Sequence, residues 1–265
     1  MTALMVMIVG VGATVALAAH SWNGYHWARK ANPFTLKLGD NVSSVWDAYL
    51  GTTSSDWSQS SVLDTAIVSG NVNPRTCKPK SGQVNVCSSK YGFNGWLGVA
   101  SIWVSGSHIT HGTVKVNDSY FNTATYNTPG WRNLVMCQEV GHTLGLDHQD
   151  EVFDNANLGS CMDYTGDPNG VQKGQLSNEH PNQHDYDQLA SIYDGHYDTI
   201  TPLSQLVARA ANGHNQETGE LNHELGQALK RDGKGHVSLF ERDFGQGHKL
   251  FTFVFWADSA VSLHE

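Results

Sequence analysis

Five residues that suit a metal site lie within eleven positions of one another in the stretch CQEVGHTLGLDH. Gln138 and His142 are spaced i and i+4, so on an α-helix they project from one face, one turn apart. Glu139 lies one residue round from Gln138, close to an ion held there but not aimed at it, as suits a base that takes a proton from water. Gly145 allows a left-handed turn that ends the helix and returns His148 to the ion. The spacing therefore predicts a site for one metal ion.

The first ligand position of this site is a glutamine. Counted from Cα, the Oε1 atom of glutamine lies as many bonds out as the Nε2 atom of histidine, so Gln138 can deliver a neutral oxygen to about the same point. Zinc accepts oxygen ligands as well as imidazole. The weaker donor predicts weaker metal binding but leaves the ion a stronger Lewis acid. A site that has lost its catalytic activity is the alternative.

The segment from Gln138 to His148 resembles the H-E-x-x-H-x-x-G-x-x-H motif of the metzincin clan of zinc metallopeptidases, which includes matrixin and astacin-like members. A second stretch, SCMDYT, supports the resemblance. Met162 follows His148 by fourteen residues and is similar to the methionine of the Met-turn, which lies beneath the zinc in that clan. Tyr164 matches the tyrosine that astacin-like and serralysin-like members place over the metal.

The resemblance implies an α/β (α+β) fold with a twisted, mostly parallel sheet, an active-site helix and a Met-turn. It also implies a secreted zinc endopeptidase. In this interpretation Gln138, His142 and His148 bind one Zn²⁺ with a water in the open position. Glu139 acts as general base, taking the proton of the metal-bound water and passing it to the leaving amine. Tyr164 helps to hold the tetrahedral oxyanion.

Proteins or peptides are the substrates that this resemblance implies. We expect the substrate to lie extended along residues 113–117, which alternate like an edge strand just before the helix. The motifs cover 138–164, the order of elements extends the resemblance to roughly 97–197, and the last sixty-odd residues match no known pattern. Two alternatives remain: a catalytically inactive metzincin-like pseudoenzyme that binds proteins or peptides in the same cleft, and a C-terminal binding module on an inert scaffold.

The elements that must position the site can be placed from local patterns. Thr128-Pro129 opens a helix that apolar spacing carries to Gly145. Alternation predicts strands, and a further helix follows; the ranges are 34–38, 61–70, 97–106 and 108–118 for strands and 184–195 for the helix. We expect three parts: a signal peptide (1–19), a metzincin-like catalytic domain (20–200), and a C-terminal extension rich in β-hairpins (201–265).

The start of the chain and its charge bear on compartment and partners. An apolar run from Leu4 to Ala19 ends in Ala-Leu-Ala, which predicts a secretory signal cleaved after Ala18 or Ala19. An uncleaved anchor is the alternative, although the run is at the short limit for a spanning helix. The net charge of −9 and the lack of a Lys/Arg cluster disfavour nucleic acid. We expect an extracellular monomer with no membrane attachment after cleavage.

The four cysteines suit an oxidising compartment and allow three pairings. Proximity in sequence favours Cys77 with Cys87, which leaves Cys137 with Cys161. Cys137 precedes Gln138 and Cys161 precedes Met162, so the second bridge would tie the ligand helix to the Met-turn. In the chain-entropy model such a loop contributes about 3 kcal/mol.

Three further patterns give weaker indications of a metal site. His108 and His111 form an HxxH pair on a presumed strand, where a regular strand would point them to opposite faces, so a structural zinc is the weaker interpretation. Aspartates and asparagines at 147–157 and 163–169 suggest Ca²⁺ only weakly, because no EF-hand spacing is present. The HELGQ stretch at 223–227 lacks the glycine turn and a third ligand, and we interpret it as an exposed segment.

Overall fold

The computed structural model describes residues 20–195, 197–198 and 225–258. The predicted signal peptide, the boundary at residue 200 and the start of the HELGQ stretch lie outside the described residues. Within them the chain forms nine strands and four helices, in the order β1 His26–Trp27, β2 Phe34–Asn41, α1 Asp47–Trp57, β3 Leu63–Ser69, β4 Gln83–Ser89, β5 Trp96–Ser105, β6 His108–Asn117, α2 Asp118–Phe121, α3 Pro129–Thr143, α4 Gln183–Tyr193, β7 Gln227–Arg231, β8 Val237–Gly245 and β9 His248–Trp256.

All nine strands belong to one sheet with the order β3-β2-β4-β6-β5-β9-β8-β7, and β1 pairs with β6. The strands from β3 to β6 are parallel to one another, whereas β5 and the strands beyond it pair antiparallel. The mixed α/β class expected from the sequence is confirmed. The expectation of a mostly parallel sheet holds only for the first half.

Strand β6 lies inside the sheet, which corrects the prediction that residues 113–117 form an edge. Its Val114 pairs with Val86 of β4 on one side and with Ala100 of β5 on the other. Because both backbone edges of β6 are occupied, a substrate cannot add to this strand.

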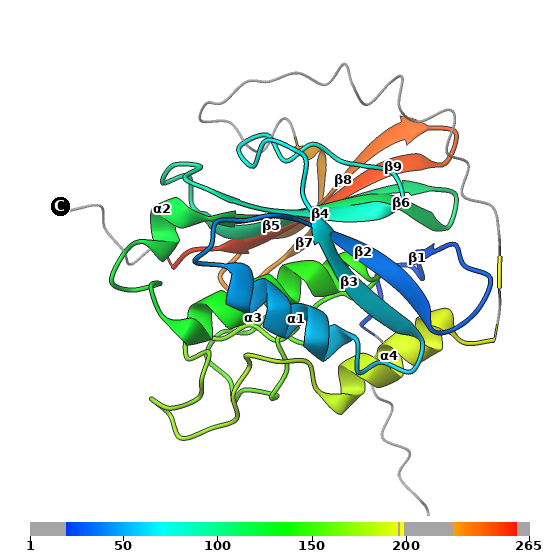
Figure 1. Cartoon of the computed structure of the whole chain (residues 1–265). Coiled ribbons are helices and arrows are strands. Elements are labelled where there is room, and N and C mark those ends of the chain that lie inside the picture. Colours follow the sequence, from blue (N-terminus) through cyan, green and yellow to red (C-terminus); the bar gives the residue numbers. More distant parts are fainter. Residues whose placement is uncertain (1–19, 196, 199–224, 259–265) are drawn as a thin grey trace, which may run out of the picture.

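The C-terminal strands continue the sheet. β9 runs antiparallel along β5 from Trp256 opposite Trp96 to His248 opposite Ser105. A turn at Gly-Gln-Gly joins β8 to β9, with Gln246 at φ 57° and Gly247 at φ 76°, the backbone that a tight hairpin turn requires. The described C-terminal residues and the strands of 20–200 therefore share one sheet (Figure 1).

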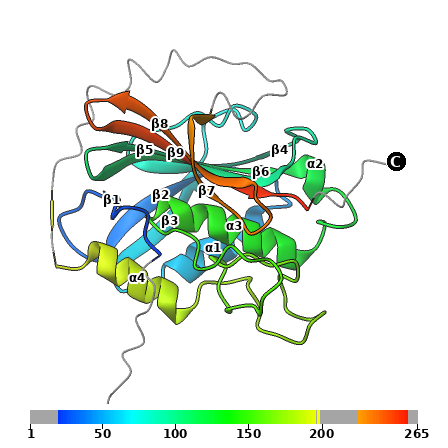
Figure 2. The same ribbon diagram turned by 180° about the vertical axis from the view of Figure 1, so that it is seen from behind.

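The helices α1, α3 and α4 lie together on one side of this sheet (Figures 1 and 2). α1 packs against α3, and α3 packs under β5 and β6. Trp57 of α1 is fully buried and its Nε1–H donates to Cys137 O at 3.2 Å, which ties the two helices together. The site-bearing helix α3 is thus enclosed between the sheet and a second helix.

Helix α4 holds the end of α3 in place. Asn182 and Asp185 form a capping box at its start, in which each side chain accepts a hydrogen bond from the other residue's backbone. At its last residue, Tyr193 donates its hydroxyl proton to Leu144 O at 2.8 Å, at the C-terminus of α3. No helix among the described residues has the length and apolar character needed to cross a bilayer.

Candidate functional site

Helix α3 begins and ends where the sequence predicts. The Thr128 side chain accepts a hydrogen bond from Trp131 N at 3.3 Å, and Pro129 occupies the first turn. Gly145 has φ +104°, and a Cβ there would lie 2.6 Å from Tyr25 O, so both backbone conformation and space require glycine. The chain leaves the helix at this point and brings His148 back beside it.

His142 and His148 face each other through their Nε2 atoms, which lie 3.0 Å apart. The Nδ1 atom of His142 lies 2.9 Å from Leu146 O, and that of His148 lies 2.7 Å from Glu151 Oε1. Carbonyl and carboxylate oxygens only accept hydrogen bonds, so each Nδ1 carries the proton. Both Nε2 lone pairs therefore point into the same small space.

Two lone pairs at this distance repel each other unless a cation lies between them. A proton is a poor candidate, because burial and the neighbouring His148 lower the pKa of His142 well below its ordinary value. Hydrogen bonds from Nδ1 to Leu146 O and Glu151 are also the outer contacts that fix the tautomer of metal-binding histidines. The pair fits a divalent ion.

Gln138 lies one turn before His142 on the same helix and is fully buried. Its Nε2 donates a hydrogen bond to Cys161 O at 2.9 Å, which fixes the orientation of the amide. The Oε1 atom is buried and has no hydrogen-bond partner in the part of the chain that the structure describes. An oriented amide oxygen that lacks a partner suits a ligand to an ion better than a packed core residue.

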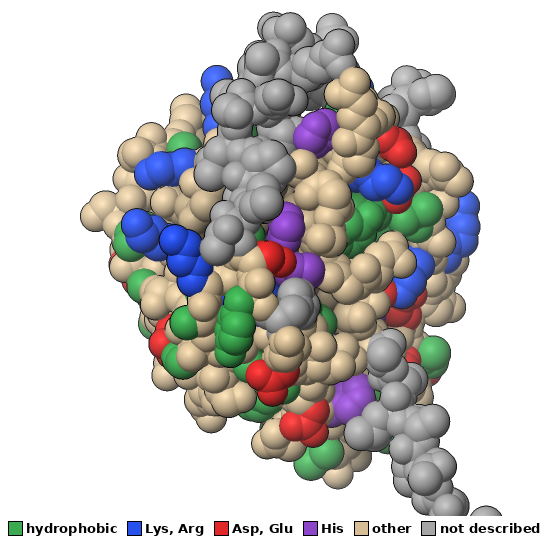
Figure 3. All heavy atoms as spheres, turned by 90° about the vertical axis from the view of Figure 1, so that its right-hand side faces the viewer, with side chains coloured by type: hydrophobic (Ala, Val, Ile, Leu, Met, Phe, Trp, Pro, Cys, Tyr) green, Lys and Arg blue, Asp and Glu red, His purple; other side chains and the backbone are tan. Residues whose placement is uncertain are grey.

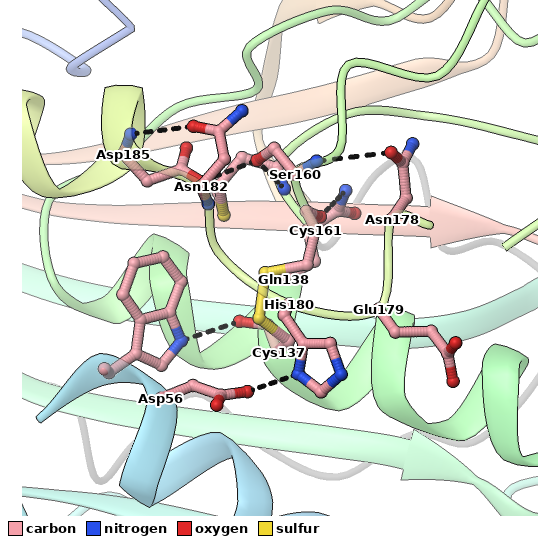
Figure 4. Close-up of a disulfide and its surroundings, with 12 residues drawn as sticks. Asp56, Cys137, Gln138, Ser160, Cys161, Asn178, Glu179, His180, Asn182 and Asp185 are labelled. Atoms are coloured by element: carbon pink, nitrogen blue, oxygen red, sulfur yellow. Dashed lines mark hydrogen bonds and ion pairs between the residues drawn. A yellow bond between two sulfur atoms is a disulfide. The ribbon is translucent and has the colours of Figure 1, made fainter. Parts of the chain in front are cut away.

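Figure 4 shows Gln138 beside the disulfide between Cys137 and Cys161, which joins α3 to the segment carrying Met162. Both disulfides, this one and Cys77–Cys87, have the pairing expected from the sequence. Met162 is fully buried, and its backbone N–H donates to Ser160 Oγ at 2.9 Å. The disulfide and this turn hold the segment of Cys161 and Met162 against helix α3 at Gln138.

Glu139 points from α3 toward β5. A Cβ on Gly98 would lie 2.5 Å from Glu139 Oε1, so glycine on β5 makes room for this carboxyl group. Glu139 is fully buried, and burial raises its pKa well above the ordinary value, an effect that the backbone of Ala100 only partly opposes. Such a carboxyl group binds a proton more readily than one in water.

Tyr164 is buried with its ring centroid 4.5 Å from that of His148. Its hydroxyl donates to Val254 O of β9 at 3.4 Å rather than to a group near the histidines. Burial, together with nearby carboxylates such as Glu151, raises the pKa of Tyr164 well above its ordinary value. The phenol is therefore a neutral donor at physiological pH.

The C-terminal strand β9 covers the site. The Phe253 ring stacks on the His142 ring with centroids 3.9 Å apart and an interplanar angle of 9°. Phe255 packs against Tyr164 at 4.8 Å. From β7, Lys230 forms an ion pair with Asp147, which adjoins His148. The described C-terminal strands therefore close the space over the histidine pair.

Two residues of this site were not foreseen from the sequence. Glu151 orients His148. The sequence signal that could have found it is an acidic residue three positions after a predicted ligand. Phe253 lies in the extension expected to be rich in β-hairpins, but no local pattern indicated which strand it would join. Of the residues considered for calcium, Asp163 accepts from Leu158 N at 2.8 Å and Asp167 from Lys173 N at 2.9 Å, each through its Oδ2 atom.

Similarity to known proteins is found among solved structures and not among protein families or curated proteins. No protein-family model matches it, and no curated protein matches it. Among solved structures, it is similar to high choriolytic enzyme 1, a hatching enzyme zinc-protease from the medaka fish Oryzias latipes. The two share 12% sequence identity and a TM-score of 0.36, over 64% of this chain and 95% of the fish protein.

Proposed function

We propose that this protein is a metzincin-like zinc endopeptidase of the extracellular space. The observation that carries the proposal is the convergence of the His142 and His148 Nε2 atoms at 3.0 Å, each with its Nδ1 proton already committed to an acceptor. The two disulfides support an oxidising compartment. We propose a monomer in which residues 20–200 carry the ligands and the strands of 201–265 cover them.

His142, His148 and the Oε1 atom of Gln138 would hold the Zn²⁺. All three are neutral ligands of the kinds that zinc accepts. Each side chain is also oriented by a hydrogen bond that its other polar atom, a nitrogen, donates to an oxygen. When bound, the ion would supply a Lewis acid that lowers the pKa of water and polarises a peptide carbonyl.

Glu139 would act as general base and then as general acid. Its buried carboxylate, with a raised pKa, would accept a proton from the attacking water and pass it to the leaving amine. Tyr164 would donate its hydroxyl to the oxyanion that forms on the carbonyl. For this to happen the hydroxyl must leave Val254 O, its acceptor while β9 is in place.

The substrate would pair with β5. Gly98 on this strand contacts Glu139, whereas β6, the strand expected from the sequence, has no unpaired edge. The edge of β5 nearest the site is taken by β9, whose Phe253 lies on His142. We infer that the enzyme is latent while β9 is in place, and that a peptide reaches the site when this strand is displaced.

The covered site also favours a second candidate, a metal-holding relative without catalysis that binds a protein or peptide in place of β9. Full-length protein, purified without chelators and supplied with zinc, separates the two. We would measure zinc per chain and hydrolysis of fluorescent casein for wild type, His142→Ala, Glu139→Gln and Phe253→Ala. Phe240→Ala is the matched control, because Phe240 is buried in a separate cluster with Trp96 and Val254.

Peptidase function predicts that His142→Ala loses one zinc per chain and that Phe253→Ala cleaves casein faster than wild type, while Phe240→Ala does not. Glu139→Gln should keep its zinc and lose hydrolysis. Zinc content unchanged by His142→Ala would overturn the metal centre. Bound zinc without hydrolysis in any variant would leave the non-catalytic relative.

A further inference from the structure

A second cluster of metal-binding side chains lies outside the site on α3, where three segments distant in sequence meet. His26 belongs to β1, His108 begins β6, and Asp198 follows α4. The Nε2 atoms of His26 and His108 approach the same oxygen, Asp198 Oδ2, at 3.1 and 2.8 Å. Figure 3 shows histidine side chains (purple) close to acidic ones (red) on this face of the molecule, the right-hand side of Figure 1.

The hydrogen bonds around a neutral His26 leave one acceptor facing another. Its Nδ1 lies 2.9 Å from Gly24 O, and because a carbonyl only accepts, Nδ1 carries the proton. In a neutral imidazole the Nε2 atom is then an acceptor, and it faces the carboxylate of Asp198, which is also an acceptor. A cation between them resolves this conflict, and the bond to Gly24 O is the outer contact that orients a ligating histidine.

Asp198 is held in position for such a role. Its backbone N–H donates to Arg29 O at 3.0 Å, which fixes the residue beside β1. Its second carboxylate oxygen, Oδ1, is buried and makes no hydrogen bond within the described ranges. The carboxylate therefore has acceptor capacity left beyond the two histidines.

We propose that His26, His108 and Asp198 bind a divalent transition-metal ion, Zn²⁺, as a structural clamp. Tetrahedral zinc with bonds near 2.0 Å places its ligands about 3.3 Å apart. The Nε2 atoms of His26 and His108 lie 3.1 and 2.8 Å from Asp198 Oδ2, and all three ligand atoms lie within 4.8 Å of one another. Two imidazoles and one carboxylate suit zinc, whereas Ca²⁺ and Mg²⁺ prefer oxygen ligands throughout.

The histidine pair considered from the sequence does not form this site. His111 lies on the same strand as His108, but its Nδ1 lies 2.8 Å from Thr110 Oγ1 and its ring packs near Trp103. The partners of His108 come instead from β1 and from beyond α4. An ion here would fasten both peripheral segments to the end of the sheet. Because the side chains of His108 and Asp198 are 16% and 26% exposed, water can supply the fourth ligand.

The test is a difference in zinc content on the full-length protein. Wild type, His108→Ala and Asp198→Asn are saturated with zinc, desalted and analysed for metal per chain. Melting temperature is then recorded with and without added zinc. His180→Ala is the matched control, because His180 Nδ1 lies 2.7 Å from Asp56 Oδ2 in a histidine–aspartate pair with no third ligand in the described part of the chain. Asp198→Asn preserves the shape of the side chain and decides the matter if His108→Ala does not fold.

We expect wild type and His180→Ala to hold one zinc more than either site variant, and the zinc-dependent rise in melting temperature to shrink in both site variants. Equal zinc contents in wild type, His108→Ala and Asp198→Asn would overturn the proposal and leave a hydrogen-bonded network. Because the comparison is a difference between variants, it holds whether or not the centre at His142 binds an ion.

Discussion

Gly141 of α3 lies directly against Met162: a Cβ at position 141 would be 2.5 Å from the methionine Sδ and 2.8 Å from Trp57 Cζ2. The residue before His142 must therefore be glycine for Met162 to pack against the helix. This close contact sets the distance between helix α3 and Met162.

Gly141→Ala should lower the free energy of unfolding by about 1–3 kcal/mol, the usual cost of overpacking a tight core. The matched control is Gly51→Ala in α1, where a new Cβ meets nothing within 4 Å. That change should stabilise the protein by about 0.5–1 kcal/mol, because alanine favours helix. Urea denaturation of both variants measures the effect, and a Gly141→Ala protein as stable as wild type would contradict the contact.

Gln138→His should tighten zinc binding, because imidazole is a stronger donor than an amide oxygen. We expect a gain on the order of tenfold, or about 1.4 kcal/mol. Competition against a chromogenic chelator measures it. Gln183→His, at an exposed position of α4, is the control and should leave affinity unchanged. No gain at position 138 would mean that Gln138 is not a ligand.

Loss of either disulfide should lower stability, but loss of only one of them should also weaken metal binding. Breaking either by a double Cys→Ser change removes a loop constraint of about 3 kcal/mol in the chain-entropy model. Only the Cys137–Cys161 bridge joins the ligand helix to the turn at Met162, so only its loss should also weaken zinc binding. The Cys77–Cys87 variant is the matched control. Equal zinc affinities in the two variants would show that the first bridge serves the fold alone.

Asp163 should make stability fall as pH rises from about 4 to 6. Burial raises its pKa from 3.8 to about 6, so in this range the folded state holds more protons than the unfolded state. The stabilisation is complete below pH 3.8 and is lost once the pH exceeds about 6, the pKa of Asp163 in the folded state. Asp163→Asn should flatten this part of the unfolding profile, while Asp187→Asn on the exposed face of α4 should not. Parallel profiles for wild type and Asp163→Asn would refute the assignment.

Local patterns predicted the features that depend on near neighbours in sequence. Helical spacing located α3, its proline and glycine gave its ends, and proximity gave both disulfides. The mixed α/β class followed from the resemblance to the metzincin clan. These features depend on contacts within a few turns or a short loop, so the sequence contains them directly.

The partner of each strand was harder to predict. Lys115 and Asn117 made β6 resemble an edge strand, yet both are accommodated inside the sheet. Lys115 Nζ lies 5.5 Å from the Tyr91 ring centre, and Asn117 donates to Gly92 O at 2.8 Å. Period-two alternation cannot distinguish a polar residue in water from one with a buried partner. Nor can it indicate that β9 pairs with β5, since that choice depends on packing across the whole chain.

The late position of β9 in the chain has a consequence for biosynthesis. Strand β5 leaves the ribosome long before its partner β9 has been synthesised, since Trp96 of β5 pairs with Trp256 of β9. Until β9 has been synthesised, the side of β5 that β9 will occupy offers unsatisfied N–H and C=O groups to other strands, which is a known route to aggregation. A nascent or prematurely stopped chain should therefore depend on chaperones, and recombinant fragments ending near residue 200 should precipitate rather than behave as a smaller version of the protein.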